Sequence, residues 1–205
     1  MTSPSTAAEQ LVGYLERRGV RHVFGLCGHT NIAVLAAMAG SDIEFVNVRH
    51  EQVAAHAADG YARVTGRASV VLSHLSPGLT NAATGVANAA LDCIPMVVIA
   101  GDVPSHYFGR HPHQEVNLHA DGAQFEIYRP FVKRAWRVDR AELLPEIIDE
   151  VRRLDRDRVQ RQAAGLELLD RHGTVPGAGA NLALTVPGRR QGGDPLQIIL
   201  ATAEQ

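Results

Sequence analysis

The 205-residue chain is predicted to fold as an α/β domain, a doubly wound parallel sheet with helices on both faces. Three observations predict this class. The apolar runs are short and lack polar alternation, which is typical of parallel strands buried on both faces. Helical patterns separate these runs, so right-handed crossovers should connect successive strands. Hydrophobic residues make up 45% of the chain and charged residues 20%, the usual balance for a globular protein with an ordinary core.

The first predicted element is a helix that starts at a capping box. Thr6 and Glu9 have the T-x-x-E spacing in which each side chain bonds the other residue's backbone N–H. Leu11 and Leu15 follow at helical spacing, and Gly19 is a typical helix stop. Next comes a short strand that runs into a glycine-containing turn, after which Thr30 or Asn31 is suited to cap another helix.

The strand-then-helix pattern repeats to about residue 99. Predicted strands cover 22–24, 45–48, 69–72 and 96–99, and predicted helices cover 51–64 and 80–91, with a turn at 76–78. In such sheets ligands bind beyond the carboxyl ends of the strands. The loops at 25–29, 50–51 and 73–81 are therefore expected on one rim.

The pattern changes twice in the second half of the chain. Residues 106–124 are rich in histidine and glycine and are predicted as a rim loop, followed by a strand within 132–138 and a helix over 141–154. Beyond Leu154 an Arg- and Asp-crowded stretch and a glycine-rich stretch precede one more possible strand at 182–186. We therefore predict a domain over 1–154 and an atypical tail over 155–205, which resembles a truncated or divergent linker.

Bulk properties argue against several function classes. A net charge of −2, with no long basic run outside the tail, does not favour nucleic-acid binding. The chain has no signal-peptide profile and no apolar run near the roughly 20 residues that span a bilayer, so a cytoplasmic location without a membrane partner is expected. Cys27 and Cys93 form no CxxC pair and are expected to be small buried residues.

Three segments resemble the motifs of one enzyme family. Residues 49–63 read RHEQVAAHAADGYAR, similar to the strand-to-helix signature around the activating glutamate of thiamine-diphosphate enzymes. Residues 76–81 read SPGLTN, similar to its GPGxTN turn, and 94–101 read IPMVVIAG, similar to a strand that follows in the same order. Over about residues 6–154 the chain resembles the N-terminal pyrimidine-binding domain of the acetolactate synthase and benzaldehyde lyase type. Two departures are Ser76, where a glycine is usual, and the tail.

The resemblance implies a role for particular residues. Glu51 would be catalytic, bonding the aminopyrimidine ring nitrogen of the cofactor, a task that requires partial shielding from water. Pro77, Gly78 and Asn81 would form the cofactor wall beside it. An isolated glutamate there would otherwise be a charge favourable to the helix dipole, and the turn an ordinary one.

His29 and Gln114 fall where related enzymes place substrate-facing polar groups, and plain surface positions are the alternative for both. The other histidines lack metal-ligand spacing, so no metal ligand is assigned.

The resemblance also implies what this chain does not supply. Mg²⁺ and the cofactor diphosphate would be held by a Gly-Asp-Gly domain that is not found in the sequence, and the expected partner is a second copy of the chain in a homo-oligomer or a separate diphosphate-binding subunit. The expected function is the pyrimidine-binding half of a thiamine-diphosphate-dependent carboligase or decarboxylase, a transferase or lyase acting on 2-oxo acids. The alternative is a non-catalytic truncated remnant that acts only in association. The acyl donor, the acceptor and any FAD remain open.

Overall fold

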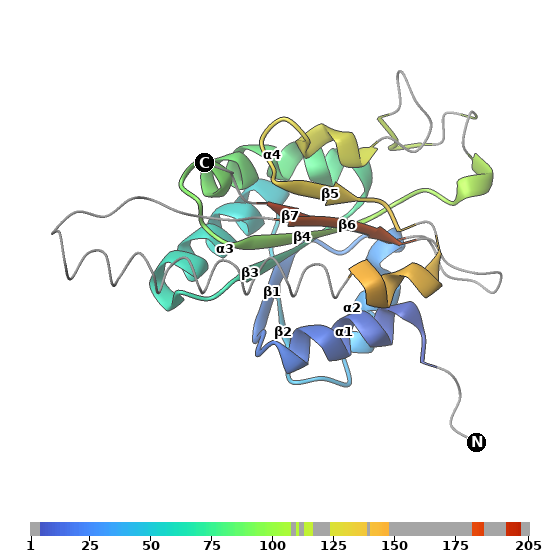
Figure 1. The fold of residues 1–205 in the computed structure, drawn as a ribbon, viewed down its shortest axis with the longest axis horizontal. Coiled ribbons are helices and arrows are strands. Elements are labelled where there is room, and N and C mark those ends of the chain that lie inside the picture. Colours follow the sequence, from blue (N-terminus) through green and yellow to red (C-terminus); the bar gives the residue numbers. More distant parts are fainter. Residues whose placement is uncertain are drawn as a thin grey trace, which may run out of the picture.

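A computed structural model describes residues 5–107, 110, 113–116, 124–138, 140–147, 182–186 and 196–201. Its centre is one sheet whose strands lie in the order β2-β1-β3-β4-β6-β7-β5 (Figure 1). The strands are β1 (His22–Gly25), β2 (Glu44–Asn47), β3 (Ser69–Ser73), β4 (Met96–Gly101), β5 (Arg134–Trp136), β6 (Leu182–Val186) and β7 (Leu196–Ala201).

The first four strands are parallel, which confirms the predicted fold class. β1 lies between β2 and β3, and β4 pairs with the far side of β3. The register aligns Gly25 with Asn47 and Ser73 with Ala100, so the carboxyl ends of these strands are nearly level. The loops that follow β1, β2 and β3 therefore open onto the same rim of the sheet.

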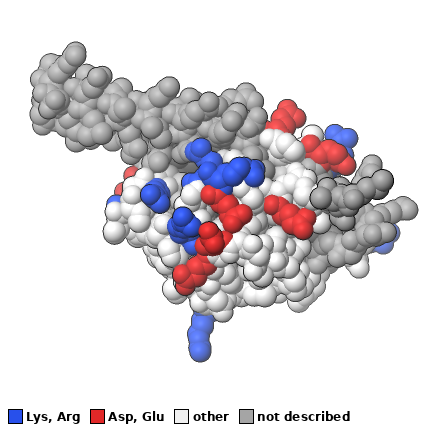
Figure 2. All heavy atoms as spheres, turned by 90° about the horizontal axis from the view of Figure 1, so that it is seen from below, with Lys and Arg blue, Asp and Glu red and all other residues white. Residues whose placement is uncertain are grey.

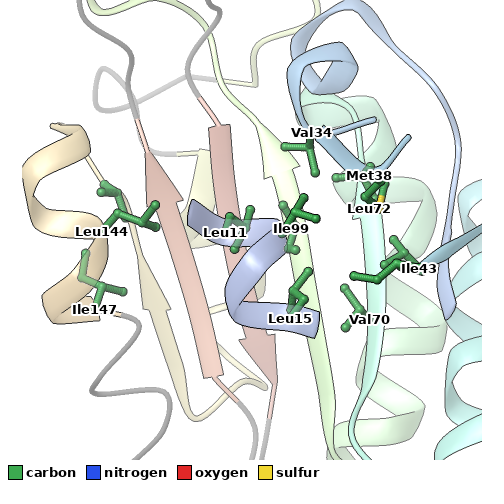
Figure 3. Packing of buried hydrophobic residues seen from close by; sticks show 13 residues of the cluster. Leu11, Leu15, Val34, Met38, Ile43, Val70, Leu72, Ile99, Leu144 and Ile147 are labelled. Carbon is green, nitrogen blue, oxygen red and sulfur yellow. The ribbon is translucent and has the colours of Figure 1, made fainter. Parts of the chain in front are cut away.

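Helices cover both faces of this sheet. Helices α1 (Ala7–Arg17) and α2 (Ile32–Met38) lie on one face, and α3 (Glu51–Thr65) and α4 (Leu75–Leu91) lie on the other (Figure 1). The predicted capping box of α1 is confirmed, because the Thr6 side chain accepts from the Glu9 N–H and Glu9 accepts from the Thr6 N–H. Leu11 and Leu15 of α1 point toward Ile99 and its neighbours in the core (Figure 3).

Helix α4 begins five residues earlier than predicted. The sequence pattern placed a turn at 76–78 and the helix from Thr80, whereas the helix starts at Leu75 and includes that turn. Pro77 is tolerated there because the first N–H groups of a helix have no intrahelical partner. Leu75 has a φ of 49°, a left-handed value that turns the chain sharply from β3 into the helix.

The second half of the chain extends the sheet. The strand expected at 182–186 is present as β6, parallel to β4, while β7 was not predicted and runs antiparallel to β4, β5 and β6. The predicted helix at 141–154 is described only to 147, with η4 (Ala141–Leu143) at its start. The boundary at Leu154 and most of the tail lie outside the described residues, so the division into domains stays a prediction.

The rim loop contains two short 3₁₀ helices, η2 (Ser105–Tyr107) and η3 (Gln124–Tyr128), with residues 113–116 described between them. Another 3₁₀ helix, η1 (His29–Asn31), precedes α2. The Asn31 side chain accepts from the Gly28 N–H and donates to the Leu26 and Ser73 carbonyls. This buried amide ties the turn after β1 to the end of β3.

The expectation for the cysteines was wrong in part. Cys27 is exposed, and Cys93 is half-buried. Cys27 lies in the open turn after β1, and Cys93 has a left-handed φ of 57° just beyond α4, so both positions are set by turns rather than by the core.

The surface and the helices add two findings. Acidic and basic side chains are interspersed on the face seen in Figure 2. Within the part of the chain that the structure describes, every helix is too short or too polar to cross a membrane.

Candidate functional site

Glu51 lies on the rim, at the first position of α3 and just after β2. His50 caps the helix by accepting from the Gln52 N–H at 3.2 Å, which sets where α3 begins. Glu51 is only 7% exposed, and its Oε2 accepts from Asn81 Nδ2 at 3.0 Å. A carboxylate that is shielded from water and aimed by an amide donor is thus held where the strands end.

Gly78 of α4 approaches the same carboxylate. A Cβ at position 78 would lie 3.2 Å from Glu51 Oε1 and would collide with Ser73 Oγ. Glycine is therefore required for close packing here, not for backbone freedom. One carboxylate oxygen is bonded to Asn81, and the other lies against a backbone that carries no side chain.

Four residues were predicted to contact the cofactor, Glu51 as the catalytic residue and three others as a wall beside it. The structure brings three of the four together: Glu51, Gly78 and Asn81. The fourth, Pro77, is exposed on the same first turn of α4. Asn81 is exposed as well, although its amide reaches the buried carboxylate.

Tyr128 is a neighbour of Glu51 that the sequence pattern did not reveal. It is fully buried at the end of η3, and its hydroxyl donates to the Leu79 carbonyl at 2.6 Å. Burial raises the pKa of Tyr128 well above its usual value, and the negative charge of Glu51 raises it further. Tyr128 therefore stays neutral even at a pH at which an ordinary tyrosine would ionise. No sequence signal marked it, because it follows a stretch without regular periodicity.

A second cluster forms around His74, between β3 and α4. Its Nδ1 lies 2.7 Å from Thr30 Oγ1, its Nε2 lies 3.1 Å from Gln114 Oε1, and its ring meets the His29 ring edge-on at 4.7 Å between centroids. The two residues predicted to face substrate, His29 and Gln114, are thus brought to one side chain. His74 was not singled out from the sequence, although its place in the predicted rim loop at 73–81 was a usable signal.

Ser76 anchors the segment that carries Gln114. Its hydroxyl donates to Gln124 Oε1 at 2.7 Å and accepts from the Val116 N–H at 2.8 Å, and its own N–H donates to the Gln114 carbonyl at 3.3 Å. The side chain is completely buried. The Ser76 hydroxyl therefore makes two hydrogen bonds that a glycine at this position could not make.

No group of three or more His, Cys, Asp or Glu side chains suited to hold a metal ion is found among the described residues. His111 and His119 lie outside them, and His113 is exposed.

Comparison with known proteins gives a consistent family. Residues 5–122 match the model described as "Thiamine pyrophosphate enzyme, N-terminal TPP binding domain"; thiamine pyrophosphate is another name for thiamine diphosphate. The chain is similar to the acetolactate synthase of Arthrospira platensis, with 42% identity over 150 residues, 71% of this chain and 25% of that protein. It is also similar to the acetolactate synthase isozyme 3 large subunit of Escherichia coli, with 40% identity over 144 residues, 70% of this chain and 24% of that protein.

A third relative is the acetolactate synthase large subunit of Buchnera aphidicola subsp. Schizaphis graminum, with 42% identity over 143 residues, 69% of this chain and 24% of that protein. The chain spans about a quarter of the length of the curated relatives it matches. The family match covers more than half of the chain, including the parallel strands β1 to β4 and the rim residues Glu51, Gly78 and Asn81. The chain therefore belongs to the thiamine pyrophosphate enzymes and carries their N-terminal TPP-binding domain, of the acetolactate synthase-like type.

Proposed function

We propose that this chain forms the pyrimidine-binding half of a thiamine-diphosphate-dependent carboligase or decarboxylase that acts on 2-oxo acids, with Glu51 as the activating acid. The observation that carries the proposal is the buried Glu51 carboxylate, oriented by Asn81 and packed against Gly78 at the end of a parallel strand.

The residues at this rim fit the aminopyrimidine end of the cofactor. Asn81 holds Glu51 Oε2, and Glu51 Oε1 lies against the backbone of Gly78, where a side chain would fill the space. A carboxyl in that position is suited to share a proton with a ring nitrogen. In the first turn of α4, exposed Pro77 precedes buried Gly78, which has no side chain and so leaves a backbone wall that a flat ring can approach closely.

When bound, thiamine diphosphate supplies a nucleophilic carbon that makes and breaks bonds beside a carbonyl group. The chain's own contribution is to hold a proton at the Glu51 carboxyl and to keep water from it. Asn81 orients the carboxylate through its side-chain amide. His29 and Gln114 are proposed to face the 2-oxo acid.

The other half of the site is proposed to come from elsewhere. Mg²⁺ and the diphosphate would be held by a diphosphate-binding domain on a separate subunit, and the chain would associate with that subunit or with a second copy of itself. The relatives, which are about four times longer than the matched region, are consistent with such a division. A cytoplasmic location belongs to the same proposal.

The role of Glu51 is tested by Glu51→Gln, which keeps the shape of the side chain but cannot release a proton to a ring nitrogen. In the complex with a diphosphate-domain protein, deuterium exchange at the cofactor C2 position, followed by proton NMR, should slow by roughly 10²–10⁴-fold, the range for general acid–base catalysis. Glu44→Gln is the matched control, because Glu44 is an exposed carboxylate on β2. Exchange that is equally fast in Glu51→Gln and Glu44→Gln contradicts the role.

The division of the site is tested by titration calorimetry of the purified chain with thiamine diphosphate and Mg²⁺, followed by pyruvate turnover with and without a diphosphate-domain protein. We expect weak binding and no turnover by the chain alone, because most of the cofactor's charge is in its diphosphate. Tight binding and turnover by the chain alone would overturn the shared-site proposal. No turnover with any such partner would instead favour a non-catalytic role.

A further inference from the structure

The His74 ring holds a fixed position at the entrance to α4. His74 is the residue immediately before the helix, and its ring packs so closely on Gly28 that a Cβ there would collide with it. Both ring nitrogens lie within hydrogen-bond distance of a side chain, Thr30 on one side and Gln114 on the other. The ring therefore links the turn after β1 to the rim loop.

These contacts determine which ring nitrogen carries the hydrogen. Gln114 Oε1 can only accept, so His74 Nε2 must be the N–H that donates to it. In the neutral ring Nδ1 is then an acceptor, and the Thr30 hydroxyl, which can donate or accept, donates to it. The carboxamide of Gln114 is thereby oriented, with its oxygen occupied and its NH₂ group directed elsewhere.

The backbone of Gln114 is also restrained. Its φ is 66°, in the left-handed region, and its carbonyl accepts from the Ser76 N–H. Two residues later the Val116 N–H donates to the buried Ser76 hydroxyl. His74 thus holds the side chain of Gln114, and Ser76 holds the backbone of the same segment.

We propose that His74 is a positioning residue that presents the Gln114 NH₂ group as a hydrogen-bond donor to a ligand oxygen. An NH₂ donor selects a ligand with an acceptor oxygen, in a carbonyl or a carboxylate group. A 2-oxo acid has both groups. The hydrogen bond to His74 uses the Gln114 oxygen, so the group that this amide can offer to a ligand is its NH₂ donor.

Gln114, which carries the proposed donor, and Glu51 lie on the same rim of the sheet. The first turn of α4 contacts Glu51 through Gly78 and Gln114 through Ser76, and His74, immediately before the helix, contacts the Gln114 side chain. The identification of the ligand as a 2-oxo acid rests on the function proposed above. The hydrogen bonds among His74, Thr30 and Gln114 do not depend on that function.

The first measurement is the tautomer of His74 in the full chain, read from nitrogen-15 NMR of histidine-labelled protein at neutral pH. We expect hydrogen on Nε2 and none on Nδ1. Thr30→Ser keeps a hydroxyl and should preserve this state, while Thr30→Val removes the donor to Nδ1. A wild-type chain with its hydrogen on Nδ1 overturns the proposal without any variant.

The second measurement follows the Gln114 side-chain NH₂ signals during titration with pyruvate. The signals should shift with pyruvate and not with ethylammonium, which offers only donors. His74→Phe keeps a ring but lacks the N–H, and it should weaken the pyruvate response by about fivefold, the effect of losing one neutral hydrogen bond. His74→Gln places an amide donor at the corresponding distance along the side chain and should restore the response.

Two results overturn the proposal: a wild-type Gln114 that does not respond to pyruvate, or a His74→Phe chain with a native backbone spectrum and an undiminished response. Neither readout involves thiamine diphosphate. A failure of the Glu51→Gln prediction would therefore count against the proposed function, whereas these results count against His74 alone.

Discussion

The two faces of the sheet are packed with side chains of very different size. Under α1 and α2 the core consists mainly of leucine, isoleucine, valine and methionine, including Leu15 and Ile99 (Figure 3). Under α3 and α4 it is rich in alanine, and Gly85 of α4 packs against Ala55 of α3. Large aliphatic side chains bury more apolar area, whereas small ones let two helices approach closely. The first face thus mainly supplies stability, and the second mainly supplies the geometry of the site.

Polar contacts reinforce the close approach of α3 and α4. Asp59 of α3 is 6% exposed and accepts from Arg63 Nε at 3.0 Å and from Asn88 Nδ2 of α4 at 2.9 Å. The hydrogen bond between Glu51 and Asn81 joins the same two helices at the rim. The site therefore depends on how α3 and α4 are placed relative to each other, and less on what lies under α1.

The largest expected effect on stability is on the aliphatic face. Leu15→Ala removes a side chain that is 3% exposed, and it should lower the free energy of unfolding by about 2–5 kcal/mol. Because α1 lies on the opposite face, the NMR signals of the Asn81 side-chain amide should not change. Urea unfolding and an amide spectrum of the folded chain measure the two quantities. A stability loss that is accompanied by a displaced Asn81 signal contradicts the separation of the two faces.

A smaller effect on stability, but a direct effect on the site, is expected at the contact between helices. In Gly85→Ala the new Cβ would lie 2.6 Å from Ala55 Cβ, so α3 and α4 must separate. We expect a loss of about 1–3 kcal/mol from overpacking and a shifted Asn81 amide signal.

Gly60→Ala is the matched control for this change. Gly60 is exposed in the interior of α3, and a Cβ there meets nothing within 4 Å. The substitution should raise stability by about 0.5–1 kcal/mol through helix propensity. If both alanines had the same effect, close packing of α3 and α4 would not explain Gly85.

The smallest loss of stability at neutral pH is expected for Tyr128→Phe, which removes one hydrogen bond to the Leu79 carbonyl and should cost about 1 kcal/mol. Its pH dependence is more informative. Since the pKa of Tyr128 is raised on folding, the folded chain retains the phenol proton where the unfolded chain loses it. Stability should therefore decline as pH rises above about 10, the ordinary tyrosine pKa.

Urea unfolding between neutral pH and pH 11 measures that decline. In Tyr128→Phe the slope of the free energy of unfolding against pH should be smaller. The difference should correspond to up to about one proton per molecule, because this phenol no longer titrates. Equal slopes in the two proteins would show that Tyr128 does not carry the effect.

The site could be anticipated from the sequence where a residue lies next to a recognisable element boundary. Glu51 follows an apolar strand and opens a helix, and Gly78 and Asn81 belong to a motif, so all three were expected on one rim. His74 was passed over although it lies in the same predicted loop. Tyr128 could not be found, because its burial depends on a 3₁₀ helix with no periodic pattern.

The alternation of strands and helices, the capping box of α1 and the position of Glu51 at a strand–helix junction were determined by the sequence itself, because each depends on residues that are close along the chain. The tertiary structure alone decided which side chains meet. Asn81 reaches Glu51 across 30 residues, and Gln114 reaches His74 across 40. Such pairs depend on how closely α3 and α4 pack and where the rim loop returns, and local spacing does not encode either distance.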